Sequence, residues 1–260
     1  MDRGRVIGLI SGKGGVGKTS LGVNLGIGLS EFGQEVTVVD ADFSASNLGV
    51  HLGKYEHPVK VQHVLDGNSD PENAIFRHPS GIKAAVSSNE IHHVEPEAGN
   101  LAHLLNEAAQ NSDYVIVDCP PGLNSTVEKV MESCDELIII TMPTQTSGIN
   151  AAQIIEKAKQ MRQPILGTVI NMSEGEPDRE LIQREVEMMT ESDTIAEIPY
   201  DEKVKESLFQ NTPLLKHEPL SEASIEIKKL AAALEGVQYE EPRFAGLKRK
   251  LNNITDTLKK

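Results

Sequence analysis

The sequence contains no tryptophan, and its other aromatic residues are few: five phenylalanines and four tyrosines among 260 residues. Hydrophobic residues make up 38% of the chain, which is enough for a sizeable core in one or two domains. The core must therefore consist mainly of aliphatic side chains, and a single α/β domain accounts for the length.

Cysteine and long apolar runs are also scarce. The two cysteines, Cys119 and Cys134, cannot supply a disulfide framework, which predicts a reducing compartment and a cytoplasmic protein. No stretch approaches the roughly 18 consecutive apolar residues of a membrane-spanning helix. The N-terminus has no long apolar signal core either.

Positive charge is in deficit over the whole chain. The 25 lysines and arginines face 39 aspartates and glutamates, so the formal net charge is −14 and the pI is near 5.0. Such a surface repels the phosphate backbone of nucleic acids. The charge therefore argues against broad non-specific DNA binding by the whole surface, although a local basic patch stays open, and no direct DNA binding is expected.

The most specific motif is a glycine-rich loop between an apolar run and a helical pattern. Residues 6–10 are typical of a buried strand, and a helix is expected over residues 20–32, ended by Gly33. Between them the spacing G-x-x-x-x-G-K-T runs from Gly12 to Thr19, as in a phosphate-binding P-loop. Glycines let backbone N–H groups turn inward around a phosphate, and the start of the following helix favours the same anion.

The loop predicts roles for three side chains. Lys18 is expected to meet the β- and γ-phosphates, and the Thr19 hydroxyl to ligate Mg²⁺. Lys13 places a second cation in the loop, and a second positive charge can stabilise the charge that develops during phosphoryl transfer. The expected nucleotide-binding residues of the loop are Gly12, Lys13, Gly14, Gly15, Val16, Gly17, Lys18, Thr19 and Ser20.

Carboxylates follow two further apolar runs. Residues 35–40 predict a strand that ends at Asp40, with Asp42 close behind, and residues 113–118 predict a strand that ends at Asp118. Open α/β sheets bind ligands at the carboxyl ends of their strands. The three aspartates are therefore expected to face the P-loop, and Asp118 is expected to hold hydrated Mg²⁺.

Strand and helix patterns alternate along the rest of the chain. This alternation predicts an α/β fold with a mostly parallel, twisted sheet of about seven or eight strands and helices on both faces. The other expected strands are 82–86, 136–141, 164–171 and 194–199, and the other expected helices are 61–65, 101–109, 148–161 and 220–234.

The run Lys-Gly-Gly-Val-Gly-Lys-Thr at residues 13–19, with the three aspartates, resembles the deviant Walker A ATPases of the MinD and ParA family. MinD-like proteins of archaeal or bacterial type resemble it most. The resemblance implies a three-layer P-loop NTPase fold and hydrolysis of ATP to ADP and phosphate, slow without an unidentified activating protein. It implies that Lys13 acts across an ATP-bridged homodimer, that Asp42 orients the attacking water and that Asp40 lies near the magnesium water shell. The expected catalytic residues are Lys13, Lys18 and Asp42, and the expected metal site comprises Thr19, Asp40 and Asp118.

The resemblance also extends to the residues that bind the base of the nucleotide. It implies that Asn171 reads the adenine and that Pro199 lies on the other wall of the base site. The segment from Asn171 to Glu174 is not the Asn-Lys-x-Asp motif of GTPases, which favours ATP. One departure is Thr144, where MinD proteins usually carry a glutamate, and it bears on the contacts of the nucleotide across the dimer.

The chain is expected to comprise a P-loop ATPase domain at residues 1–235, an acid-rich linker at 236–242 and a basic amphipathic helix at 243–260. The last segment has six lysines or arginines and one acid, Asp256, so it is formally +5. A basic helix with an apolar stripe predicts binding to an anionic membrane surface or a partner groove, with docking on the protein's own body or a coiled-coil seam as alternatives. It resembles the membrane-targeting tail of MinD. The stripe comprises Phe244, Leu247, Leu251, Ile254 and Leu258.

The resemblance implies an ATP-dependent dimerisation switch for spatial positioning of the cell division site or other cellular structures, with peripheral membrane association in the ATP state. A flagellar-placement regulator and a ParA-type partitioning ATPase are alternatives. An iron–sulfur carrier of the P-loop class is a further one, but such carriers normally have a Cys-x-x-Cys pair, whereas Cys119 and Cys134 are fifteen residues apart.

Overall fold

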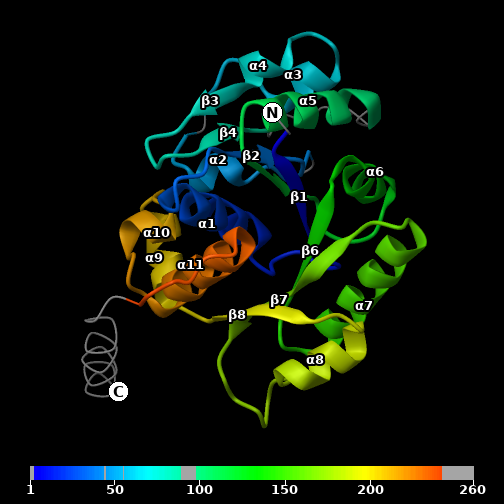
Figure 1. Cartoon of the computed structure of the whole chain (residues 1–260), viewed down its shortest axis with the longest axis vertical. Coiled ribbons are helices and arrows are strands. Elements are labelled where there is room, and N and C mark those ends of the chain that lie inside the picture. Colours follow the sequence, from blue (N-terminus) through cyan, green and yellow to red (C-terminus); the bar gives the residue numbers. More distant parts are fainter. Residues whose placement is uncertain (1–2, 44, 55, 89–97, 242–260) are drawn as a thin grey trace.

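A computed structural model describes residues 3–43, 45–54, 56–88 and 98–241. An eight-stranded sheet lies between two layers of helices (Figure 1). Its strand order is β3-β4-β2-β5-β1-β6-β7-β8, and every neighbouring pair is parallel except β3 and β4. The strands are β1 Arg5–Ile10, β2 Val36–Asp40, β3 Ile75–Arg77, β4 Lys83–Ala85, β5 Tyr114–Asp118, β6 Glu136–Thr141, β7 Ile165–Ser173 and β8 Thr194–Pro199.

The helices divide between the two faces of the sheet. Side chains of α5, α6 and α7 pack in one aliphatic core, and those of α1, α10 and α11 pack in the other. The helices are α1 Lys18–Glu31, α2 Leu48–His51, α3 Val61–Leu65, α4 Pro71–Ala74, α5 Ala98–Gln110, α6 Ser125–Ser133, α7 Gln145–Gln160, α8 Gln183–Thr190, α9 Glu202–Phe209, α10 Leu214–His217 and α11 Glu222–Glu235.

The central strands are buried on both faces, which explains their continuous apolar runs. In β5, Val115 and Val117 belong to one core and Ile116 to the other. Helix α1 crosses the sheet on two glycines: a Cβ at Gly22 would lie 3.0 Å from Leu9, and one at Gly26 would lie 2.9 Å from Val38. The glycines therefore set how closely α1 approaches the strands that carry the site.

The predicted fold class is confirmed, with three differences in detail. Strand β3 was not expected, because three residues are too short to show a period. Helix α7 begins at Gln145 rather than residue 148, because Thr144 caps it by accepting a hydrogen bond from the Ser147 N–H at 3.3 Å. Helices α2, α4, α6, α8, α9 and α10 were not expected either, since their four to nine residues carry few buried apolar side chains.

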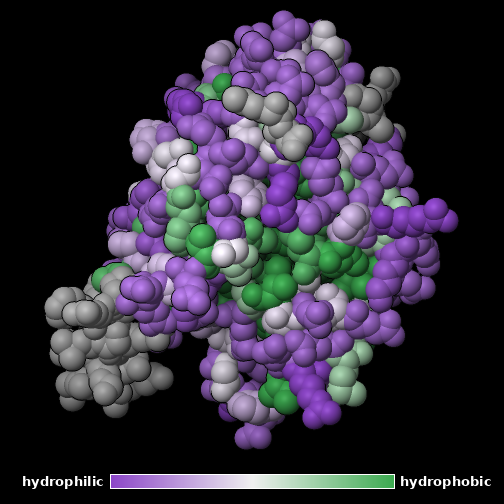
Figure 2. Space-filling model, in the orientation of Figure 1, coloured by the Kyte–Doolittle hydropathy of each residue, from purple (hydrophilic) through white to green (hydrophobic). Residues whose placement is uncertain are grey.

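The surface is mostly polar, with an apolar band across the middle of the face shown in Figure 2. Within the described ranges, no helix has both the length and the apolar character needed to cross a bilayer. The expected terminal helix at 243–260 lies outside the described residues. The linker ahead of it begins at Gly236, which ends α11 in the left-handed region at φ +68°.

Candidate functional site

The P-loop joins the end of β1 to α1, and its geometry is that of an anion cradle. Gly15 and Gly17 adopt left-handed φ values of +80° and +86°. A Cβ at Gly17 would also lie 2.4 Å from the side-chain nitrogen of Asn171, so only glycine fits. Lys18 is buried and donates to the Ser11 hydroxyl at 3.0 Å, and that hydroxyl donates to the Lys13 carbonyl at 2.8 Å. The predicted loop thus forms, with Lys18 folded across it.

Two of the predicted aspartates lie side by side at the carboxyl edge of the sheet. Strands β2 and β5 are neighbours, and their register pairs Asp40 with Asp118. The Thr19 hydroxyl donates to Asp118 Oδ2 at 2.5 Å. Asp118 Oδ1 is buried and has no hydrogen-bond partner within the described part of the chain. Asp40 accepts from the Ser46 hydroxyl at 2.6 Å and from the Asp42 N–H at 3.1 Å.

Burial perturbs both carboxyl groups. It raises the pKa of Asp40 to about 8, and the nearby charge of Asp118 adds to this, while the Ser46 hydrogen bond opposes it. Burial also raises the pKa of Asp118 to about 6, against the Thr19 hydrogen bond and the charge of Lys18. The positive charge near the pair is therefore too small to keep both carboxyl groups ionised at their usual pKa values. Two carboxylates, a hydroxyl and an unsatisfied buried oxygen are the hard oxygen donors that suit Mg²⁺.

Asp42 lies two residues beyond β2 and is half-buried. Its Oδ1 accepts from the Ala45 N–H at 3.0 Å, and its charge contributes to the raised pKa of both Asp40 and Asp118. The structure therefore brings all three predicted aspartates to the mouth of the P-loop.

A cavity of about 180 Å³ opens beside the loop and is mostly apolar. Asn171, at the end of β7, donates its side-chain N–H to the Val16 carbonyl at 2.7 Å and lines this cavity together with Ser20 and Pro199. Several other lining residues carry no sequence signal of their own, because they come from β7, α9 and the loop between β8 and α9. These residues are Met172, Tyr200, Val204, Lys205 and Leu208.

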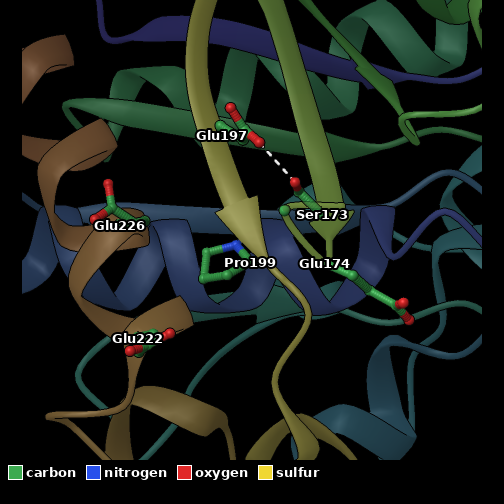
Figure 3. A pocket seen from close by; sticks show the side chains of 7 residues that line it. Ser173, Glu174, Glu197, Pro199, Glu222 and Glu226 are labelled. Atoms are coloured by element: carbon green, nitrogen blue, oxygen red, sulfur yellow. Dashed lines mark hydrogen bonds between the residues drawn. The ribbon is translucent and has the colours of Figure 1, made fainter. Parts of the chain in front are cut away.

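Beyond Pro199 lies a second hollow of the opposite character. Figure 3 shows Glu197 at the edge of the sheet and Glu222 and Glu226 on α11, with Glu174 just after β7. Their negative charge disfavours a phosphate there. Among these two hollows and the loop, only the P-loop presents the positive charge and backbone N–H groups that phosphates need.

The outer face of the P-loop carries Lys13, which is exposed and forms no ion pair with any described residue. Two exposed apolar side chains adjoin residues that contact the P-loop. Leu123 is 46% exposed, and its neighbour Gly122 donates its N–H to the Ser11 carbonyl at 2.9 Å. Ile149 is 52% exposed, and its neighbour Asn150 packs on Gly12, where a Cβ would lie 2.6 Å from the asparagine Cβ.

Comparison with known proteins places this site in a family. The model of the ParA family, described as NUBPL iron-transfer P-loop NTPase, matches residues 3–235. An ATP-binding protein of Methanocaldococcus jannaschii is 34% identical over 94% of this chain and 91% of its own length. The cell division ATPase MinD of Pyrococcus furiosus superposes with a TM-score of 0.84 at 29% identity, covering 90% of this chain and 99% of that one. The septum site-determining protein MinD of Pyrococcus horikoshii, solved with Mg-ADP, gives 0.83 at 27% identity, over 89% and 96%.

Proposed function

Because the chain belongs to the ParA family of P-loop NTPases and is MinD-like, we propose that it hydrolyses ATP as a dimerisation switch that positions other structures at a membrane surface. Its cofactors are ATP and Mg²⁺. The observation that carries the proposal is the meeting of Lys18, Thr19 and the Asp40–Asp118 pair at the mouth of the P-loop.

Each group at the mouth has a separate task in this proposal. The loop N–H groups and Lys18 bind the β- and γ-phosphates, where Lys18 exchanges its Ser11 partner for phosphate oxygen. Thr19, Asp118 and Asp40 would hold Mg²⁺, and the ion would supply positive charge that neutralises the phosphates. Asp42 orients the attacking water towards the γ-phosphate.

The base site supports ATP rather than GTP. The Asn171 N–H donates to the Val16 carbonyl, and a carbonyl can only accept, so this bond sets which way the amide points. The Asn171 Oδ1 is then left as an acceptor for the nucleotide. An acceptor suits the 6-amino group of adenine and repels the 6-oxo group of guanine.

The surface around Lys13 supports a second copy of the chain as the partner. An exposed lysine within the phosphate loop can reach a nucleotide held by another subunit. The exposed Leu123 and Ile149 adjoin residues that contact the loop, and they supply apolar area for such a contact. In a twofold dimer each copy offers the same surface, so both sites are completed together.

The family description mentions iron transfer, but the thiols of this chain favour the switch. Cys119 and Cys134 are both buried, and burial raises the pKa of each thiol, that of Cys119 well above its usual value. Metal ligation uses the thiolate, and an iron carrier needs an accessible one. The function therefore rests on the nucleotide site.

The proposal is tested first at Lys13. We expect Lys13→Ala to retain ATP binding, because Lys18 and the loop N–H groups remain, but to lose hydrolysis by a factor of about 10³. Phosphate release and calorimetric ATP binding measure the two effects. Lys159→Ala removes another exposed lysine, on α7, and should leave both unchanged. Unimpaired hydrolysis by Lys13→Ala would contradict the action of Lys13 in the partner's site.

Oligomeric state supplies the second test. Asp42→Ala should slow hydrolysis and hold the ATP-bound dimer, so size-exclusion chromatography with light scattering should show a dimer with ATP and a monomer without it. A monomer under both conditions would refute the dimerisation switch.

A further inference from the structure

One residue of β7 has a backbone conformation that its position does not explain. Within the described residues, four non-glycine residues have positive φ. Arg162, Glu191 and Asn211 stand at the ends of α7, α8 and α9, where a left-handed residue commonly closes a helix. Met172, at φ +59°, lies inside a strand. Backbone strain of this kind persists only where the surrounding structure enforces it, and strained residues cluster at ligand-binding and active sites.

The strain produces a bulge in the pairing of β7 with β8. The register passes from Asn171 opposite Ile198 to Ser173 opposite Pro199, so Met172 is an extra residue. Consecutive strand residues normally point to opposite faces. Here, however, both side chains approach Gly17. A Cβ added at Gly17 would lie 3.2 Å from the Met172 Cε and 2.4 Å from the Asn171 Nδ2.

The residues on both sides hold Met172 in this conformation. Ser173 donates its hydroxyl to Glu197 on β8 at 2.6 Å, as Figure 3 shows, and its carbonyl accepts from the Tyr200 N–H at 2.8 Å. Asn171 is tied to the P-loop by its bond to the Val16 carbonyl. With both neighbours fixed, the left-handed turn directs the Met172 side chain into the cavity that Asn171 and Tyr200 also line.

A polarisable thioether beside an amide matches the two parts of a nucleobase. The base has a flat aromatic face, which a methionine sulfur and methyl group contact favourably, and a polar edge, which an amide can read. We propose that Met172 is a base-binding contact for the nucleotide, placed by the bulge against the face of the adenine ring while Asn171 meets its edge. This inference rests on the proposed ATP site.

The test separates the side chain from the backbone strain. Met172→Ala keeps the left-handed strain, whereas Met172→Gly relieves it, and both remove the thioether. We expect both variants of the full chain to weaken calorimetric binding of Mg-ADP by about tenfold. The glycine variant should melt about 2–4 °C above the alanine variant. Binding of magnesium tripolyphosphate, which has no base, should match that of wild type.

A matched pair at Glu191 controls for backbone relief. Glu191 is left-handed at the end of α8, away from the cavity lining, so Glu191→Gly should melt above Glu191→Ala with no change in Mg-ADP affinity. Wild-type affinity in both Met172 variants would overturn the inference, and so would an equal loss for tripolyphosphate, which would indicate a disturbed P-loop. Failure of wild type to bind Mg-ADP would refute the proposed function instead.

Discussion

At the scale of single residues, the proposed role of Asp40 needs a carboxylate, but the buried environment of Asp40 disfavours the charged form. Its carboxyl group belongs to the proposed metal site, yet it is fully buried beside Asp118. Without a cation the folded protein holds a proton there up to about pH 8, the pKa to which burial raises Asp40, whereas the unfolded chain releases it near pH 4. The apo protein therefore binds more protons folded than unfolded across this window.

This linkage predicts a pH dependence of stability. Because the folded state binds the extra proton, the free energy of unfolding should fall as pH rises from about 4 to about 8, by at most about 1.4 kcal/mol per pH unit from this group. Asp40→Asn cannot titrate, so its Tm should fall less over the same range. Thermal melts of both apo proteins between pH 5 and 8.5 measure the difference, which should be largest at the alkaline end. Parallel Tm curves would show that Asp40 is already ionised in the apo protein.

At the scale of elements, the loop after β5 and the start of α7 both attach to the P-loop. The Gly122 N–H donates a hydrogen bond to the Ser11 carbonyl, and Asn150 packs against Gly12. A nucleotide that repositioned the P-loop would therefore also move the exposed side chains next to these contacts. In the proposed switch, these attachments link the bound nucleotide to the docking of a second copy.

The prediction at this scale concerns Leu123 and Ile149. We expect Leu123→Glu and Ile149→Glu to weaken the ATP-dependent dimer at least tenfold, since each places a charge in an apolar contact. ATP binding by the monomer should be unchanged. Phe209→Glu is the control, because Phe209 is 90% exposed on α9. Concentration-dependent light scattering with ATP gives the dimer constant, and equal constants for all three variants would place the interface elsewhere.

At the scale of the whole molecule, charge is divided unevenly between the body and the tail. Residues 243–260 are formally +5, so the rest of the chain, which brings the total to −14, is −19. An acidic body is repelled by an anionic membrane, while the basic tail is attracted to it. A single short tail binds weakly, and two tails in one dimer bind together with higher avidity. Dimerisation would then decide where the protein resides.

The tail gives the prediction for the whole molecule. Co-sedimentation with anionic liposomes should require ATP and should be lost when residues 243–260 are removed. Leu251→Glu should abolish it as well, because it interrupts the apolar stripe, whereas Asn252→Glu adds the same charge off the stripe and should weaken binding only modestly. An unchanged pellet after removal of the tail would refute the membrane role.

Local sequence patterns were sufficient to predict the P-loop, the strands that lead to Asp40 and Asp118, and the parallel three-layer fold. These depend on local spacing, on continuous apolar runs and on the rule that parallel strands present their carboxyl ends at one edge. Asn171 and Pro199 were also predicted, through the resemblance to known ATPases, and the structure places both at one cavity. Their roles remain predictions that the experiments above address.

The rest of the base site is formed by packing between residues that are distant in the sequence. No local pattern shows that Asn171 bonds to Val16, 155 positions away, or that Met172 adopts a left-handed turn within a strand. Tyr200 and Val204 likewise reach the cavity only through the packing of β8 and α9. Such features arise from the register between β7 and β8 and from contacts between residues distant in the sequence. Neither the register nor these contacts leave a periodic pattern in the sequence that could predict them.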